Sequence, residues 1–364
     1  MGLLITTATL IKQSTKKSIR DLMQTIINAA IELAASDIHL CPQQNNSVSI
    51  KFRIDGIIHT LTVIEQALYL QLIVHIKVLA NLDITITNKP QDGSFIIAKP
   101  KKTNCRVNLC PTIFGQRAVI RLIKEIQGLD LAKLGLLSDQ IEILINTLKR
   151  KQGLILTVGP TGSGKTVTLY SLLAHLKKSG LNIMTACDPV EIHLADISQT
   201  AVKTEINLDY PEILRTFLRQ DPDVIMIGEI RDEKTLKIAI QAATTGHLVL
   251  SSIHTSNAPS AIHRLCYLGL DTKTIKSSIN LILAQRLVRK TCKSCSQKQP
   301  DCNFCLDGYH GVIGIYELLE LSKHKLNNET IENIKATPQL SDIASHLISN
   351  NITNHEEITR VLGT

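Results

Sequence analysis

The sequence predicts an α/β protein with two domains. Its 364 residues exceed the usual size of one domain, and its 44% of hydrophobic residues can supply two packed cores. From about residue 137 to 270, short apolar runs alternate with helical patterns, which is typical of a parallel sheet covered on both faces. Strand patterns before that point predict a smaller α/β domain. We place the domains at 1–124 and 137–364, with a linker at 125–136.

The first domain is expected to combine two helices with several short strands. Asp55-Gly56 lies between two strand patterns and predicts a tight hairpin turn. The C-terminal segment 330–364 is polar and is expected to be helical. The helices of the first domain are expected at 18–36 and 67–79, and its strands at 37–40, 48–54, 57–61, 93–98, 105–109 and 118–123.

A glycine-rich loop lies near the start of the second domain. It follows an apolar, strand-like run at 154–158 and precedes helical spacing over 168–178. Free backbone N–H groups and the helix dipole would together favour a phosphate chain there. The pattern G-x-x-x-x-G-K-[ST] predicts that Lys165 contacts the β- and γ-phosphates and that Thr166 binds Mg²⁺. An incidental Gly-Lys-Thr turn is disfavoured, because all parts of the motif are in register. The loop residues are Gly159, Pro160, Thr161, Gly162, Ser163, Gly164, Lys165, Thr166 and Val167.

Acidic residues and a histidine follow three further apolar strand patterns. Glu229 is placed to orient or deprotonate an attacking water, or to hold the metal through a water. The alternative is a surface acid after a buried strand. Asp188 and Glu191 form a second candidate pair for positioning water or metal, or a simple polar loop. His254 ends another strand pattern, where it could sense a γ-phosphate or fill a structural role.

Charge and composition limit which ligands, surfaces and compartments suit this chain. The net charge of +8 is a modest basic bias that suits phosphate ligands or an anionic membrane face without proving either. Aromatic residues make up only 3%, with no Trp, so base stacking is poorly supplied. No apolar stretch reaches the roughly 18 residues needed to span a bilayer, and Met1 to Ser18 lacks the order of a signal peptide. We therefore expect a soluble, cytosolic chain.

Four of the nine cysteines form two C-x-x-C pairs separated by six residues. Each pair can place two thiolates on one metal ion, so the two pairs together predict a structural zinc site. The alternative is a surface loop of reduced cysteines without metal. The predicted ligands are Cys292, Cys295, Cys302 and Cys305; the single cysteines are Cys41, Cys105, Cys110, Cys187 and Cys266.

Together these motifs resemble the type II secretion and type IV pilus assembly ATPase family, over about residues 20 to 320. The matching blocks of the second domain are GPTGSGKTVTLY (159–170), DPVE (188–191), LRQDPDVIMIGEIRD (218–232), TTGHLVLSSIHT (244–255), AQRLVR (284–289) and GIYELL (314–319). Those of the first domain are ASDIHL (35–40), FRIDG (52–56) and KPQDGS (89–94).

The resemblance implies a RecA-like P-loop NTPase core, a PAS-like N-terminal domain and roles for site residues. Glu229 becomes the catalytic carboxylate, Asp188 and Glu191 belong to an acidic box, and His254 belongs to a histidine box. The family also places a zinc-binding loop where the four cysteines lie. Arginine suits the spread charge of a γ-phosphate because it donates two parallel hydrogen bonds. The arginines implied are Arg106 and Arg121 from the first domain, and Arg215, Arg219 and Arg231 from the second.

The resemblance also implies a function. Such proteins are hexameric motor ATPases that act on an inner-membrane platform protein, as peripheral proteins on the cytoplasmic face of the membrane. ATP, Mg²⁺ and structural Zn²⁺ would be the cofactors, and no direct nucleic-acid binding is expected.

Three features depart from the family pattern. Cys187 stands where the family usually has Glu, Ser94 stands where many relatives carry Arg, and the chain begins close to the second N-terminal domain. The KPQDGS block and this shortness look most like the competence-type members, which build a DNA-uptake pseudopilus in Gram-positive bacteria.

Other classes of P-loop protein fit less well. A GTPase should carry an N-K-x-D motif downstream of the loop, and the sequence has none. A kinase would need a pocket for a second substrate, for which no signal is visible. A nucleic-acid translocase or helicase remains the alternative from another class, but it would use a basic, aromatic-lined channel that this composition disfavours.

Overall fold

The computed structural model describes residues 2–98, 102–123, 129–295, 302, 304–321, 336 and 338–363. The chain divides into two compact units, residues 1–125 with 291–311 and residues 126–290 with 312–364. The segment that carries the four cysteines therefore groups with the first unit, although the sequence assigned it to the second domain. The boundary region 124–128 lies outside the described residues.

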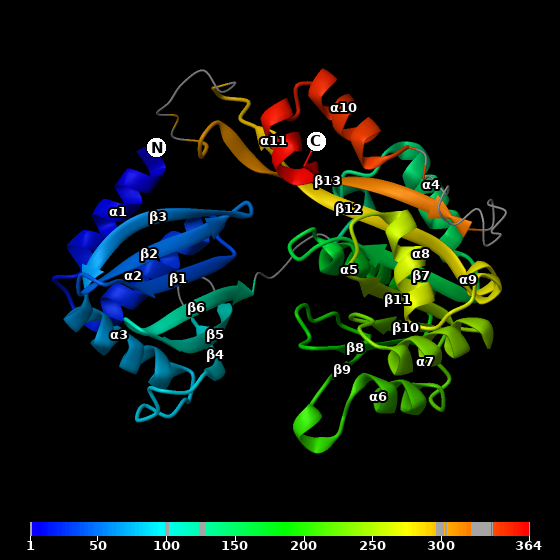
Figure 1. The fold of residues 1–364 in the computed structure, drawn as a ribbon, viewed down its shortest axis with the longest axis horizontal. Helices are drawn as coiled ribbons and strands as arrows, with labels where there is room; N and C mark the ends of the chain where they lie inside the picture. Colours follow the sequence, from blue (N-terminus) through cyan, green and yellow to red (C-terminus); the bar gives the residue numbers. More distant parts are fainter. Residues whose placement is uncertain are drawn as a thin grey trace. The chain divides into compact units, whose positions relative to one another are not determined.

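The first unit contains a six-stranded sheet in the order β3-β2-β1-β6-β5-β4, and its neighbouring strands are antiparallel (Figure 1). Apolar side chains of the helices pack against this sheet to form one core. The strands are β1 (Asp37–Pro42), β2 (Ser47–Ile54), β3 (Ile57–Glu65), β4 (Gln91–Ile97), β5 (Thr103–Thr112) and β6 (Gly115–Ile123), and the helices are α1 (Gly2–Ser14), α2 (Ile19–Glu32) and α3 (Gln66–Leu79).

The hairpin between β2 and β3 forms as predicted. Asp55 and Gly56 both have left-handed backbones, with φ of 47° and 83°, which a two-residue turn of this kind requires. Helix α1 was not predicted, because its threonines and isoleucines have low helix propensity. Ile11 is fully buried in the core of this unit, so tertiary packing stabilises the helix.

The second unit is built on a seven-stranded sheet in the order β13-β12-β7-β11-β10-β8-β9. The strands from β12 to β9 pair in parallel, which confirms the predicted parallel sheet (Figure 1). Its strands are β7 (Gly153–Val158), β8 (Ile183–Cys187), β9 (Ser198–Ala201), β10 (Val224–Ile227), β11 (Leu248–Ile253), β12 (Ile279–Thr291) and β13 (Tyr309–Glu320).

Helices cover this sheet on both faces, so it has two cores. Along β7, Leu154 and Leu156 lie in one core and Ile155 in the other, as alternation in a strand requires. Every residue of β7 is buried, and its sequence is accordingly apolar apart from Thr157. The first core includes α6 (Tyr210–Phe217), α7 (Glu233–Thr244), α8 (Ala258–Tyr267) and α9 (Thr272–Ser278), and the second includes α4 (Ser138–Leu148) and α5 (Lys165–Leu176).

The C-terminal segment contains two helices, α10 (Leu340–Ser349) and α11 (His355–Leu362), as predicted; residues 330–335, 337 and 364 lie outside the described part. Glu357 of α11 is completely buried and accepts hydrogen bonds from the backbone N and Nε of Arg289 at 2.9 and 2.8 Å. This ion pair joins α11 to β12. Among the described helices, none is both long and apolar enough to cross a membrane.

Candidate nucleotide site and cysteine cluster

The glycine-rich loop follows the carboxyl end of β7, an inner strand of the sheet, and leads into α5. Gly159 and Gly164 begin and end it with positive φ of 156° and 88°. A Cβ on Gly159 would lie 2.4 Å from Oγ of Ser163, and one on Gly164 would lie 3.1 Å from Nε2 of Gln285. Glycine is therefore required at position 159 for steric as well as conformational reasons, and at position 164 for its left-handed backbone. The predicted order of strand, glycine-rich loop and helix N-terminus is confirmed.

Lys165 lies inside this loop. Its side chain is only 9% exposed, and Nζ donates hydrogen bonds to the carbonyl oxygens of Gly159 at 2.7 Å and Pro160 at 3.0 Å. Burial is the main cause that lowers the pKa of Lys165 to about 8. The positive charge of Arg286 lowers this pKa further, and the negative charge of Glu229 acts to raise it. Phosphate oxygens would be stronger acceptors for this ammonium group than carbonyl oxygens are. The loop and its lysine thus fit a triphosphate.

Thr166 occupies the second position of α5 and is half-buried. Its place in the first helical turn, beside the lysine, suits a hydroxyl ligand for Mg²⁺. That role stays a prediction.

Three predicted residues come together beyond the ends of β10 and β11. Glu229 accepts a hydrogen bond from Nη2 of Arg231 at 2.5 Å on one oxygen, and Nε2 of His254 lies 3.3 Å from the other. Burial acts to raise the pKa of Glu229, but the hydrogen bond and charge of Arg231 and the charge of His254 outweigh it, so the pKa is lowered. Glu229 is therefore ionised at neutral pH.

The acidic segment after β8 faces the same cluster. The charges of Asp188 and Glu229 both act on the hydroxyl of Tyr210, whose pKa is raised mainly by burial. The Tyr210 oxygen would lie 3.1 Å from a Cβ on Gly228, so it sits close above the backbone that leads to Glu229. Sequence reasoning missed Tyr210, because only the packing of α6 over the strand ends brings it there.

Cys187, which stands before Asp188, is buried in the second core of this sheet. Its Sγ lies 3.7 Å from the hydroxyl of Tyr170 on α5, and burial raises the pKa of the thiol. Glu191 is exposed in the loop that follows. The charge of Asp188 therefore acts on Tyr210 and Arg231, and the residue before it is a thiol in place of a second carboxylate.

The remaining arginines are placed in two groups. Arg215 and Arg219 are exposed on and just after α6, with local contacts: Arg215 pairs with Glu212 at 3.3 Å, and Arg219 donates to the carbonyl of Arg215 at 3.0 Å. Arg106 and Arg121 lie directly opposite each other on β5 and β6 of the first unit. Nε of Arg121 donates to Oδ1 of the buried Asp37 at 2.9 Å. The described contacts leave the roles of these four arginines as predictions.

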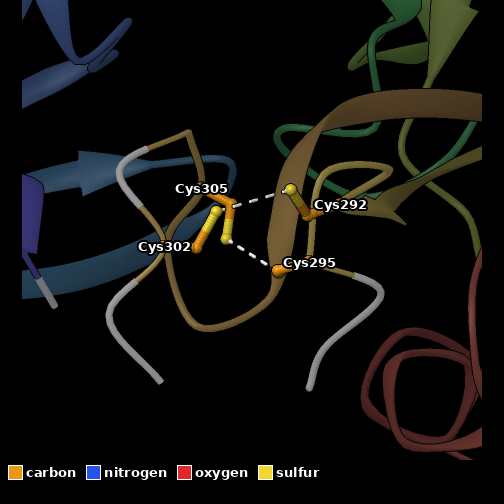
Figure 2. A group of neighbouring side chains, drawn as sticks. All are labelled: Cys292, Cys295, Cys302 and Cys305. Carbon is orange, nitrogen blue, oxygen red and sulfur yellow. Dashed lines mark hydrogen bonds between the residues drawn. The ribbon is translucent and has the colours of Figure 1, made fainter. Parts of the chain in front are cut away.

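The four predicted metal ligands converge at one point (Figure 2). All four cysteines are buried, and their sulfur atoms lie within 4.8 Å of one another. A tetrahedral zinc ion with Zn–S bonds of about 2.3 Å would place its sulfurs about 3.8 Å apart. The pairs Cys292–Cys302 and Cys295–Cys305 are separated by 4.0 and 3.6 Å. This donor set fits zinc.

The cysteine loop is anchored on the β2–β3 hairpin of the first unit. Leu306 packs against the core of that unit. Oδ2 of Asp307 lies 3.9 Å from Nδ1 of His59, and the backbone N of Gly311 donates to Oδ2 of Asp55 at 3.2 Å. The Asp55-Gly56 turn thus serves both as the hairpin connection and as a contact for this loop.

Comparison with known proteins agrees with these features. Residues 12–360 match the family described as "Type II/IV secretion system protein". The chain is 40% identical over 346 residues to "Protein transport protein HofB homolog" of Haemophilus influenzae, covering 94% of this chain and 73% of that protein. It is 40% identical over 319 residues to "Type IV pilus assembly ATPase PilB" of Pseudomonas aeruginosa, covering 80% of this chain and 56% of that protein.

Solved structures share the fold. The Legionella pneumophila ATPase DotB superimposes with a TM-score of 0.73 at 20% identity, covering 93% of this chain and 94% of its own. The pilus retraction motor PilT, solved with bound ADP, superimposes with a TM-score of 0.59 at 28% identity, covering 92% of this chain and 91% of that chain. The second unit is accordingly a RecA-like P-loop core. The chain belongs to the type II/IV secretion system protein family, which includes the secretion and pilus-assembly ATPases that its motifs resemble.

Proposed function

We propose that this chain is a motor ATPase that hydrolyses ATP to power the assembly of a type IV pilus-like filament or a type II secretion apparatus. The observation that carries this proposal is the cluster of Glu229, Arg231 and His254 on the sheet edge that holds the phosphate loop. β11, which ends one residue before this histidine, pairs directly with β7, which leads into the loop. Relatives named for protein transport and for pilus assembly support a role of this ATPase in secretion or filament assembly.

The residues divide the chemistry between them. The amides of the 159–167 loop and Lys165 bind the β- and γ-phosphates, and Thr166 would hold Mg²⁺, which when bound neutralises phosphate charge. Glu229, kept ionised by its neighbours, orients the attacking water and accepts its proton. His254 and Asp188 position this carboxylate and water.

The proposal includes a hexamer in which the arginines complete the site. Arg106 and Arg121 lie opposite each other on neighbouring strands of the first unit. Arg215 and Arg219 are exposed on the second unit. Guanidinium groups stabilise the charge that spreads over a γ-phosphoryl group during transfer. We assign these arginines, with Arg231, to the nucleotide sites of the assembled ring.

The location and partner follow from the same proposal. The motor acts on the cytoplasmic face of the membrane, against an inner-membrane platform protein. Turnover should then rise with oligomerisation or with that partner, and should be independent of DNA. Strong stimulation by DNA alone would instead favour a nucleic-acid translocase.

The specific filament we propose is a DNA-uptake pseudopilus, supported by the KPQDGS block at 89–94. Deletion of the gene, scored for transformation by external DNA, for surface filaments and for protein secretion, tests this. Loss of transformation alone supports the proposal, and intact transformation with loss of secretion contradicts it.

A further inference from the structure

Gln285 contacts the phosphate loop from the neighbouring strand. β12 runs beside β7 with Ala284 opposite Val158, so Gln285 comes level with Gly159, the first residue of the loop. The side chain is fully buried, and Nε2 donates a hydrogen bond to the carbonyl oxygen of Ser163 at 2.7 Å.

The contact is tight at both ends of the loop. The backbone oxygen of Gln285 would lie 2.7 Å from a Cβ on Gly159, and its Nε2 would lie 3.1 Å from one on Gly164. The glycines and this glutamine therefore fit as one unit. This glutamine belongs to the AQRLVR block at 284–289, whose pattern alone predicts no role for it.

The environment of Oε1, the other polar atom of the Gln285 side chain, shows that the stabilising contact is made by Nε2. Oε1 of Gln285 is buried and has no hydrogen-bond partner among the described residues. A buried, unpaired amide oxygen destabilises a fold, and an apolar side chain of similar size would avoid that penalty. The contribution of Gln285 must therefore come from its donor, the Nε2 group that binds Ser163.

We propose that Gln285 is a positioning residue for the nucleotide site, an inference that rests on the proposed function. In a planar trans peptide, the C=O and the following N–H point in opposite directions. By holding the carbonyl of Ser163, Gln285 turns the N–H of Gly164 away from itself and toward the space enclosed by the loop. That amide is one of the donors a phosphate needs at a helix N-terminus.

Methionine at position 285 tests the donor, because its side chain has a similar size and carries no N–H group. In Gln285→Met we expect the Kd for MgATP to rise about 5- to 10-fold, the value of one hydrogen bond. Gln285→Glu should weaken binding further, because a carboxylate would repel the Ser163 carbonyl. Gln285→Asn keeps an amide but cannot reach Ser163, so it should match methionine and serves if another variant fails to fold.

Gln140 is the matched control. It is 1% exposed in the same unit, and its Nε2 donates to the carbonyl of Tyr316 at 2.7 Å. Gln140→Met should lower the melting temperature while leaving the Kd for MgATP unchanged. The proposal is overturned if Gln285→Met and Gln285→Asn bind like wild type, or if the control weakens binding equally. Failure of the wild type to bind MgATP would instead overturn the proposed function itself.

Discussion

Nε2 of His254 lies 3.3 Å from Oε2 of Glu229. The two residues follow neighbouring parallel strands, in which Ile227 pairs with Ser251, so the register of the sheet sets this distance. Arg231 binds the other oxygen of the carboxylate. Glu229 is therefore held on both sides at the edge of the sheet that carries the phosphate loop, in an ionised and oriented state.

Removing the imidazole should slow hydrolysis more than it weakens binding. In His254→Ala we expect kcat to fall about 10-fold or more, since hydrogen bonds to charged groups contribute about 1.5–3 kcal/mol. The Kd for MgATP should stay within about twofold. Steady-state ATPase assays with equilibrium binding measure both quantities.

His247 provides the control for this change, because it precedes the same strand at its opposite end and contacts the carbonyl of Ala242 at 3.1 Å. If His247→Ala lowers kcat as much as His254→Ala does, the effect is one of strand stability and not of the carboxylate.

Nucleotide affinity should depend on pH through Lys165. Its pKa is lowered to about 8, chiefly by burial, and bound phosphate would raise it. Affinity is then full below pH 8 and falls as pH rises through 8 toward the pKa of the complex, and binding above pH 8 takes up a proton. Calorimetry in buffers of different ionisation enthalpy measures this uptake. Proton uptake that persists unchanged in Lys165→Met would assign it to another group.

Local features were predictable from the sequence because their determinants are local. The Asp55-Gly56 turn needs two left-handed residues, and the loop at 159–167 needs glycines at fixed positions, so both are visible as short patterns. The parallel sheet followed from short, largely apolar runs such as β7.

The features that the sequence missed depend on contacts between distant segments. Gln285 reaches Ser163 across 122 positions of the chain, and no spacing rule links them. Tyr210 approaches Gly228 only because α6 packs over the strand ends. The cysteine loop groups with the first unit through contacts of Asp307 and Gly311 with the β2–β3 hairpin, which the spacing of its cysteines could not reveal.

The cysteine cluster should hold one zinc ion per chain. Cys295→Ser should lose most of that zinc and lower the melting temperature, because structural zinc contributes directly to folding free energy. The exposed Cys110 gives a control variant, Cys110→Ser, that should keep its metal. Elemental analysis of purified protein measures the content, and wild-type protein with far less than one zinc per chain would contradict the site.

Loss of the metal should also increase hydrogen–deuterium exchange in the β2–β3 hairpin of the first unit. Hydrogen–deuterium exchange over residues 55–59 should rise in the Cys295→Ser protein, because that hairpin binds the loop through Asp55 and His59. Unchanged exchange there would mean that the loop docks without its metal.

Glu357 should dominate the stability of the C-terminal helices. Burial acts to raise its pKa, but hydrogen bonds from Arg360 and Arg289 lower it overall. The carboxylate therefore stabilises the fold above the unfolded pKa of about 4.3, and this stabilisation is lost as pH falls below it. Glu357→Gln should cost about 3–5 kcal/mol because it removes the carboxylate that pairs with the buried Arg289. Chemical denaturation measures this, and Glu356→Gln, at the exposed neighbour, should change stability little.

Single-turnover hydrolysis by Glu229→Gln tests the role of the phosphate loop and its carboxylate most directly. Protein in excess over radiolabelled MgATP is incubated, and bound ATP and released phosphate are followed with time. We expect wild type to convert its ATP, and Glu229→Gln to retain intact ATP with a rate reduced by about 10²- to 10⁴-fold. Hydrolysis by Glu229→Gln at the wild-type rate would contradict the assignment.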